Sequence, residues 1–492
     1  MIFTVKKRAR LFAMITISLF LLGLAPAPAQ ESSPTYSYNM TFDRDGLTTV
    51  EIVYDGGFPG SGSSWVAVPK NFTGTVVTAL KGTVTSMARR PYQAGEGQTV
   101  HPFYDNLTFS YNSADAPFSM RILFNMTYGA MIVEPNGFFF SPQIGVARSA
   151  RVQATLMLPD GVEALNEVEP TPTRIGRIGP RLQLLFYLDS ESRIAVTFTL
   201  SWPKGTSHIQ EGMVEGDVPT RYVDLSTRML RLYREAVPLM NSLFNETMDR
   251  ISMRFFIPLT LPQLGIGGYT PIDPSTFQTG AIYLNLFYFR AVPGTMETIA
   301  MHELTHQYEA RAGISPELLW VHEGLANYVA VQMGKRLGYD ATSTDAELEA
   351  AATQLNGEYG VIQNWQHGGT AAPLFLYYAS SYKVFKTLGD QYGGLPLYSS
   401  FFRGLHELKD GLRSTNVVVY QLSLAASADL GQQFTAWGFE LVDLLNLNAQ
   451  ISKLRKEAEW YGPIIPFRDR ALSHLEQAQT SFSSAPEVAL GH

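Results

Sequence analysis

The stretches HELTH, at residues 302–306, and WVHEGLA, at residues 320–326, decide the fold that we expect for this chain. The two histidines of HELTH are four positions apart, about one helical turn, so both imidazoles leave the same face of a helix. Glu303 lies about 100° around that helix from His302, so it can reach a water beside a metal ion without binding the ion itself. The pentapeptide therefore predicts a metal site on a helix.

The flanking residues predict two helices joined by a short connection. Thr295 is a candidate N-cap of the first helix, and Gly313 suits the left-handed position after its last turn. Ser315 and Pro316 are typical of the start of a second helix. A short connection favours antiparallel neighbours, so Glu323, expected about two turns into the second helix, returns toward the histidines.

We therefore predict that His302, His306 and Glu323 bind one Zn²⁺ per chain, with Glu303 as general base. Two imidazoles and one carboxylate leave the fourth position of the ion for water, which is typical of a catalytic zinc and not of a closed structural site. The chain contains no cysteine, which excludes cysteine-ligated metal sites and thiol catalysis.

Three further polar residues have weaker interpretations. Asn327 lies one turn beyond Glu323 and either orients a histidine ligand or is an ordinary polar residue on a helix flank. For His322 we expect a structural or substrate-pocket role and not ligation. His367 is expected in a loop, where it either touches substrate or is simply solvated.

The rest of the chain changes character near residue 203. Before that point, short runs rich in β-branched and aromatic residues alternate with turn residues, which predicts an antiparallel β-sandwich. After it, helix-like stretches dominate, interrupted by predicted strands at 250–259 and 280–289 and by a long Gly/Pro loop at 261–280. The expected organisation is a signal peptide at 1–29, a β-sandwich domain at 30–203, a linker at 204–219, a catalytic domain at 220–446 and a C-terminal helical segment at 447–492.

The N-terminus predicts export from the cytoplasm. A basic start, KKRAR at 6–10, precedes an apolar run at 11–25, and APAPA follows, so cleavage after Ala29 is expected. Contact with a membrane is expected only if this leader is not removed. Five N-x-T sequons make glycosylation a hypothesis for an exported chain; they start at Asn39, Asn71, Asn106, Asn125 and Asn245. The net charge of −7, without basic runs, argues against a nucleic-acid partner.

HELTH followed by W-x-x-E-G-x-A resembles the gluzincin metallopeptidases, in particular the aminopeptidase N-like group, although the interval between His306 and Glu323 is shorter than is usual there. The resemblance implies a thermolysin-like α+β zincin domain between a β-rich domain and C-terminal helices. It also implies a tyrosine that donates to the oxyanion. Tyr378 matches the spacing of that tyrosine, and Tyr382 is the competitor.

The same resemblance implies a strand that carries a glutamate for the free amine of the substrate. In the resemblance, the counterpart of this strand is the sequence GAIYLN at 280–285, which has no glutamate. Its backbone is still expected to pair with an extended peptide as an added strand.

The function that we predict is an exported zinc-dependent metallopeptidase acting on a peptide or protein substrate, with the choice between aminopeptidase and endopeptidase left open. The main alternative is a non-catalytic cell-surface β-sandwich protein that retains the zincin domain as a scaffold. A third possibility is a zinc hydrolase that acts on a non-peptide bond. The sequence does not indicate the oligomeric state.

Overall fold

The computed structural model describes residues 33–484 except 71–73, 93–103, 145–149, 189–191, 367–372, 409–410 and 461–467. The expected signal peptide at 1–29, Asn71 and His367 lie outside the described residues. Within the described residues, no helix combines the length and the apolarity that a membrane span requires.

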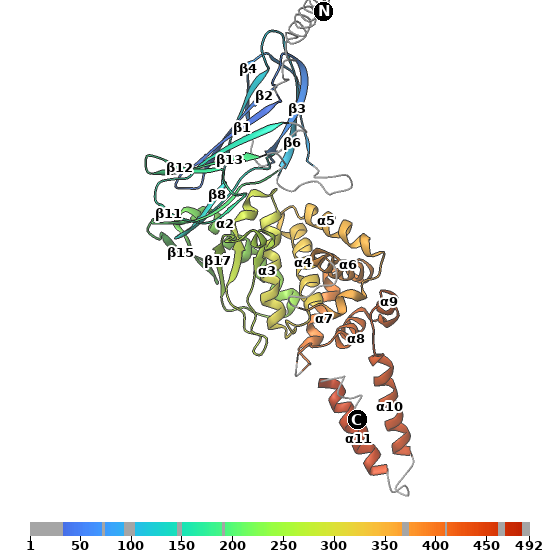
Figure 1. Cartoon of the computed structure of the whole chain (residues 1–492). Coiled ribbons are helices and arrows are strands. Elements are labelled where there is room, and N and C mark those ends of the chain that lie inside the picture. The colour runs from blue at the N-terminus through green and yellow to red at the C-terminus, as the bar shows by residue number, and fades with distance from the viewer. Residues whose placement is uncertain are drawn as a thin grey trace, which may run out of the picture.

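The N-terminal half is built from β-sheets, as predicted (Figure 1). Nearly all neighbouring strands are antiparallel, and β1 and β10 form a parallel pair. The seven-stranded sheet has the order β12 (Arg174–Ile178), β13 (Arg181–Leu188), β10 (Arg151–Met157), β1 (Thr35–Phe42), β2 (Thr48–Asp55), β7 (Ser119–Met126) and β4 (Val76–Lys81). The three-stranded sheet has the order β3 (Gly60–Pro69), β6 (Tyr104–Ser113) and β5 (Thr83–Pro91).

A four-stranded sheet connects this half to the rest of the molecule. Its order is β11 (Val162–Glu169), β14 (Ala195–Leu200), β9 (Asn136–Phe140) and β8 (Ala130–Val133). On one face, Phe139 stacks on Phe42 of the seven-stranded sheet with ring centroids 5.6 Å apart. On the other face, Phe140 meets Phe287 of the second half edge-on at 5.4 Å. Because both faces of β9 are buried, its sequence is a continuous aromatic run without the alternation of a half-buried strand.

The stretch 204–219, predicted as a linker, instead forms a hairpin of β15 (Thr206–Glu211) and β16 (Val214–Pro219). This hairpin belongs to a five-stranded sheet with the order β15, β16, β17 (Ile251–Phe256), β19 (Ile282–Asn285) and β18 (Gly268–Tyr269). The prediction was wrong because Val214 and Val218, which alternate along β16, are fully buried in the core of the second half.

Helices make up most of the remaining chain. They are α2 (Val223–Phe244), α3 (Thr295–Arg311), α4 (Leu319–Leu337), α5 (Thr342–Ala352), α6 (Leu374–Tyr392), α7 (Leu395–Leu405), α8 (Thr415–Ala426), α9 (Gly431–Ala436), α10 (Leu444–Trp460) and α11 (Arg468–Ser484). The last two lie side by side at the end of the molecule away from the β-sheets (Figure 1). The expected mixed α+β region and the C-terminal helices are thus present.

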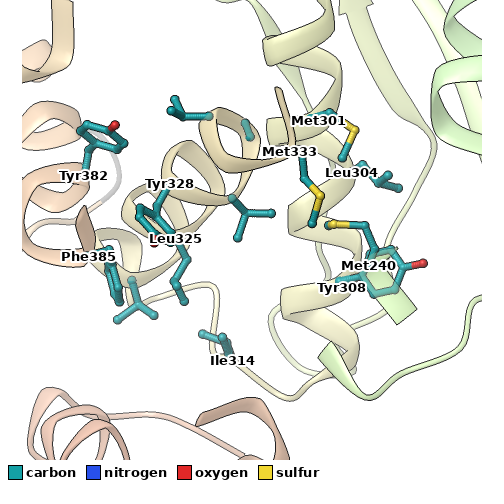
Figure 2. Close-up of a cluster of buried hydrophobic side chains, with 14 of the residues drawn as sticks. Met240, Met301, Leu304, Tyr308, Ile314, Leu325, Tyr328, Met333, Tyr382 and Phe385 are labelled. Carbon is teal, nitrogen blue, oxygen red and sulfur yellow. The ribbon is translucent and has the colours of Figure 1, made fainter. Parts of the chain in front are cut away.

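The core around α3 and α4 fixes the position of both helices. Met301 and Leu304 of α3 and Leu325 of α4 are fully buried (Figure 2). A side chain at Gly324 would place its Cβ 2.5 Å from the ring of Phe385 on α6, so only glycine allows α4 and α6 to approach this closely. Helix α4 thus packs against α6 through the face that carries Gly324, and it also contacts α3.

Candidate metal centre

Helix α3 begins and ends close to the predicted positions. Its N-cap is Gly294, and Thr295, predicted as the cap, is the first helical residue. After the last turn, Gly313 has φ of 79°, the left-handed conformation that the sequence predicted. His302, Glu303 and His306 thus lie in the middle of α3, where the backbone is held by hydrogen bonds on both sides.

Helix α4 begins later than predicted. Its N-cap is Leu318, so Ser315 does not cap it, and Glu323 lies one turn into the helix instead of two. The reason is tertiary: the backbone around Ser315 pairs with another segment, and its N–H donates to the carbonyl of Leu412 at 2.8 Å. This pairing keeps the connection extended where local capping preferences favour a helix.

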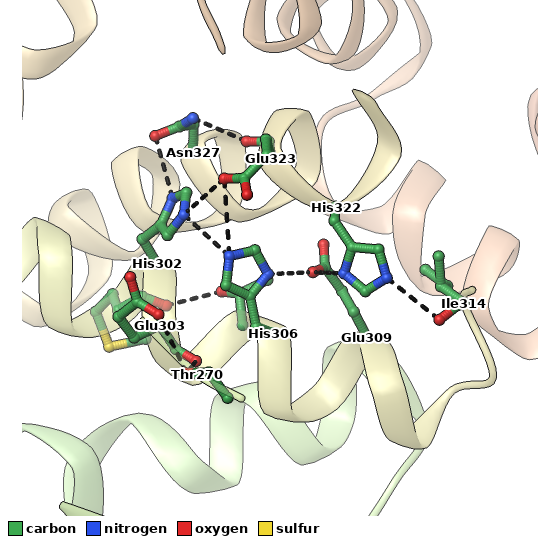
Figure 3. A network of polar contacts seen from close by, with 11 residues as sticks. Thr270, His302, Glu303, His306, Glu309, Ile314, His322, Glu323 and Asn327 are labelled. Atoms are coloured by element: carbon green, nitrogen blue, oxygen red, sulfur yellow. Dashed lines mark hydrogen bonds and ion pairs between the residues drawn. The ribbon is translucent and has the colours of Figure 1, made fainter. Parts of the chain in front are cut away.

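The two helices run antiparallel, and Figure 3 shows the side chains of Glu323 and both histidines converging between them. The Nε2 atoms of His302 and His306 are 3.0 Å apart. Glu323 Oε2 is 3.1 Å from His302 Nε2 and 3.8 Å from His306 Nε2. His306 is buried, whereas His302 and Glu323 are partly exposed, so the cluster has one side open to solvent.

These three atoms fit a single metal ion. Two ligand atoms that each lie 2.0–2.1 Å from a tetrahedral zinc are about 3.3 Å apart, close to the three separations observed. Glu323 Oε2 is itself buried and accepts no hydrogen bond. Its negative charge therefore faces the two imidazoles and no hydrogen-bond donor. Burial alone would raise the pKa of Glu323, but the imidazoles of His302 and His306 lower it below its usual value. The donor set therefore favours a bound cation.

Each histidine has a polar partner at its other ring nitrogen. Asn327 accepts from His302 Nδ1 at 3.2 Å, and its amide donates to the carbonyl of Glu323 at 2.8 Å. The first of the two interpretations of Asn327, that it orients a ligand, agrees with this contact. His306 Nδ1 instead lies 2.8 Å from Glu309 Oε2.

Glu309 was missed in the sequence. It is fully buried, and the same Oε2 atom also lies 2.8 Å from Nδ1 of His322. The signal that marks it is its position three residues after His306, on the same face of α3. His322 is only 3% exposed and does not line the open side of the cluster, which favours the structural one of the two roles expected for it.

Glu303 lies beside the three ligand atoms without belonging to them. Thr270, next to the end of β18, donates to Glu303 Oε2 at 3.1 Å and contacts its main-chain carbonyl at 3.0 Å. Burial raises the pKa of Glu303, the histidines oppose this shift, and Glu323 adds to it. A Cβ at Gly268 would lie 2.7 Å from Glu303 Cγ, so β18 packs directly against the glutamate. The carboxylate is thus held in one orientation.

The strand at the edge of the five-stranded sheet is β18 and not β19. The expectation that the backbone of residues 280–285 pairs with substrate is wrong, because β18 already pairs with β19 on that side, through Gly268 with Leu284 and Tyr269 with Tyr283. The cause is that the Gly/Pro-rich stretch 261–280, expected as a loop, folds back as part of a hairpin. Among the described strands, β18 has no second neighbour.

The structure separates the two candidate tyrosines on α6. Tyr378 is partly buried against Trp365, with ring centroids 5.1 Å apart, and burial together with Glu323 and Glu303 raises the pKa of its hydroxyl. The hydroxyl of Tyr382, in contrast, donates to Asp345 at 2.5 Å within the helical core (Figure 2). The carboxylates of Glu323 and Glu303 therefore affect the pKa of Tyr378, whereas the hydroxyl of Tyr382 is bonded to Asp345.

Comparisons with known proteins add little to this geometry. No protein-family model matches the chain, and no curated protein sequence matches it. Among solved structures, aminopeptidase A of Legionella pneumophila in complex with aspartic acid is similar, with 13% identity and a TM-score of 0.32. That similarity covers 85% of this chain and 50% of the other, so this chain spans about half the length of that protein. At this TM-score the similarity supports no argument about function.

Proposed function

We propose that this chain is an exported zinc metallopeptidase of the gluzincin type, which hydrolyses peptide bonds in a peptide or protein substrate. The observation that supports it most is the convergence of His302 Nε2, His306 Nε2 and Glu323 Oε2 within 3.8 Å of one another, beside a buried Glu303. Two nitrogens and one oxygen are the ligand set of catalytic zinc sites with an open position. When bound, zinc supplies an acidified water and a positive charge for the carbonyl oxygen of the substrate.

Glu303 acts as general base in this proposal and then as general acid. Its raised pKa suits it to accept a proton and to return that proton to the leaving amine. The hydrogen bond from Thr270 fixes one carboxylate oxygen and leaves the other to meet the attacking water. A purely structural metal site has no need for this group, so its retention supports catalysis over the scaffold alternative.

Tyr378 donates to the oxyanion in this proposal. No hydrogen bond to its hydroxyl exists among the described residues, and a tyrosine hydroxyl is protonated at neutral pH. A protonated donor beside the site of developing negative charge stabilises the transition state more than the ground state.

The substrate pairs with the free edge of β18 in this proposal. This edge lies next to Glu303, as the close contact at Gly268 indicates. An extended peptide there would receive main-chain hydrogen bonds, as in other cases of strand addition. Residues 265–271 include no acidic side chain that would hold a free amine, so the proposal does not restrict cleavage to chain ends.

The first test measures zinc content and cleavage of casein and of a peptide library by the purified protein, with Glu303→Gln as the matched variant. We expect one zinc per chain in both, cleavage by the wild type, and a loss of about 10²–10⁴-fold in the variant. Equal cleavage by Glu303→Gln would overturn the mechanism. Bound zinc without cleavage of any peptide would favour the scaffold alternative, and a chelator-sensitive ester or amide substrate would favour a non-peptide hydrolase.

A further inference from the structure

Behind the three metal-ligand atoms lies a second group of charged side chains that the proposed reaction does not use. Glu309, fully buried on α3, is contacted at Oε2 by Nδ1 of His306 and by Nδ1 of His322, each at 2.8 Å (Figure 3). The second ring nitrogen of His322 is 3.2 Å from the carbonyl oxygen of Ile314. The four groups form one chain of contacts that runs from the metal-ligand cluster to the connection between the two helices.

These contacts have the character of hydrogen bonds and not of a second metal site. Both imidazoles meet the same carboxylate oxygen at 2.8 Å, the usual length of a charge-assisted N–H···O bond. Nε2 of His322 faces a carbonyl, so it must donate there, and a proton must also lie between Nδ1 and Glu309. The other oxygen of Glu309, Oε1, is buried and makes no hydrogen bond, so the negative charge is concentrated on the contacts to the two histidines.

This arrangement selects one tautomer of His306. Its Nδ1 faces the carboxylate of Glu309 and therefore holds a ring proton, so Nε2 is the nitrogen that can bind the metal ion once any proton on Nε2 is displaced. A carboxylate at that position also increases the basicity of the ligating nitrogen. His322 compensates the buried carboxylate with a second hydrogen bond, because a lone buried charge on Glu309 would be costly.

We infer that Glu309 and His322 are positioning residues that act together to hold His306 ready for the metal ion, and this inference rests on the proposed metal site. Both residues are anchored to Ile314 in the connection: the backbone carbonyl of Glu309 accepts from the N–H of Ile314 at 3.0 Å, and His322 donates to the carbonyl of Ile314. The second metal ligand and the position of α4 relative to α3 therefore depend on one network.

The test compares Glu309→Gln, His322→Gln and the double variant with the wild type. The readouts are the zinc dissociation constant, from competition with a chelating indicator, the number of zinc ions per chain, and the melting temperature of the metal-free protein. We expect each single variant to bind zinc about 10–100-fold more weakly, the range seen when a partner of a metal ligand is removed. The double variant should lose about as much as the worse single variant, because both residues act through one network.

Tyr308→Phe is the matched control. Tyr308 lies next to Glu309 on α3, is fully buried, and donates to Asn241 at 2.6 Å away from the metal-ligand atoms. Its loss should lower the melting temperature without changing the zinc dissociation constant. If Glu309→Gln behaves like this control, or if the wild type binds two zinc ions per chain, the inference is overturned.

The failure of the proposed function is distinguishable from the failure of this inference. A wild type that binds zinc but cleaves no peptide contradicts the proposed function alone, and the zinc affinities of the variants still decide the positioning role. A wild type that binds no zinc contradicts both.

Discussion

The hydroxyl of Thr270 lies 3.1 Å from the carboxylate and 3.0 Å from the main-chain carbonyl of Glu303, and so fixes the expected general base to the edge of the sheet. A buried carboxylate with a raised pKa gains orientation from this single neutral donor without losing its capacity to accept a proton. The contact joins two segments more than thirty residues apart, and nothing in either segment alone indicates it.

Replacing Thr270 tests this contact directly. Thr270→Val keeps the shape but removes a hydrogen bond to a charged group, worth about 1.5–3 kcal/mol. We expect kcat to fall about 10–100-fold with zinc content unchanged, measured by steady-state kinetics and metal analysis. Thr270→Ser keeps the hydroxyl and should retain most activity; equal losses in both variants would contradict a role for the hydrogen bond.

Gly268 should tolerate no side chain. A Cβ there would lie 2.7 Å from Glu303 Cγ and 2.9 Å from the carbonyl oxygen of Tyr283, so Gly268→Ala has to displace the base or the strand. A displacement of about 1 Å costs about 10²-fold in rate, and we expect a kcat loss of that order. Gly265→Ala is the control, because its Cβ would meet no atom within 4 Å; an equal loss there would contradict this argument.

The two tyrosines of α6 should behave differently when their hydroxyls are removed. Tyr378→Phe should lower kcat by about 10²–10³-fold with little change in the melting temperature. Tyr382→Phe breaks the hydrogen bond to Asp345 and should cost about 1.5–3 kcal/mol of stability with kcat unchanged. Steady-state kinetics and thermal denaturation of both variants measure these effects. A loss of kcat in Tyr382→Phe but not in Tyr378→Phe would assign the oxyanion donor to Tyr382.

Zinc uptake by the metal-free protein should strengthen as pH rises. Burial lowers the pKa of His306, but Glu309, Glu323 and Glu303 outweigh it and raise that pKa to about 10. Below about pH 10 zinc must therefore displace a proton, so its apparent affinity should rise up to about tenfold per pH unit. Competition titrations at about pH 6, 7 and 8 measure this, and an affinity independent of pH would contradict it.

The same shift has a consequence for the stability of the metal-free protein. The folded-state pKa of His306 lies above its unfolded value of about 6.5. Protonation of His306 therefore stabilises the folded form fully below that unfolded value, and the contribution is lost as pH rises through about 10. The stability difference between wild type and His306→Ala, from denaturant titrations without metal, should shrink as pH rises through about 10, whereas a difference independent of pH would exclude this linkage.

The sequence was enough to predict the three residues whose ligand atoms converge between α3 and α4. Spacing along a single helix is local, so His302 and His306 had to share a face wherever α3 lay. The position of α3 and the left-handed conformation of Gly313 were also local properties, and the structure confirms them. The strand content of the N-terminal half followed from the same kind of pattern.

Tertiary structure alone decided the rest, because those features depend on segments that meet only after folding. The backbone pairing of Ser315 with Leu412 delayed the start of α4, and burial of Val214 and Val218 turned the expected linker into a hairpin. The hairpin of β18 covered the strand expected to bind substrate. Thr270, the partner of Glu303, and His322, the second partner of Glu309, lie on other elements than the residues they contact, and no sequence periodicity specifies these contacts.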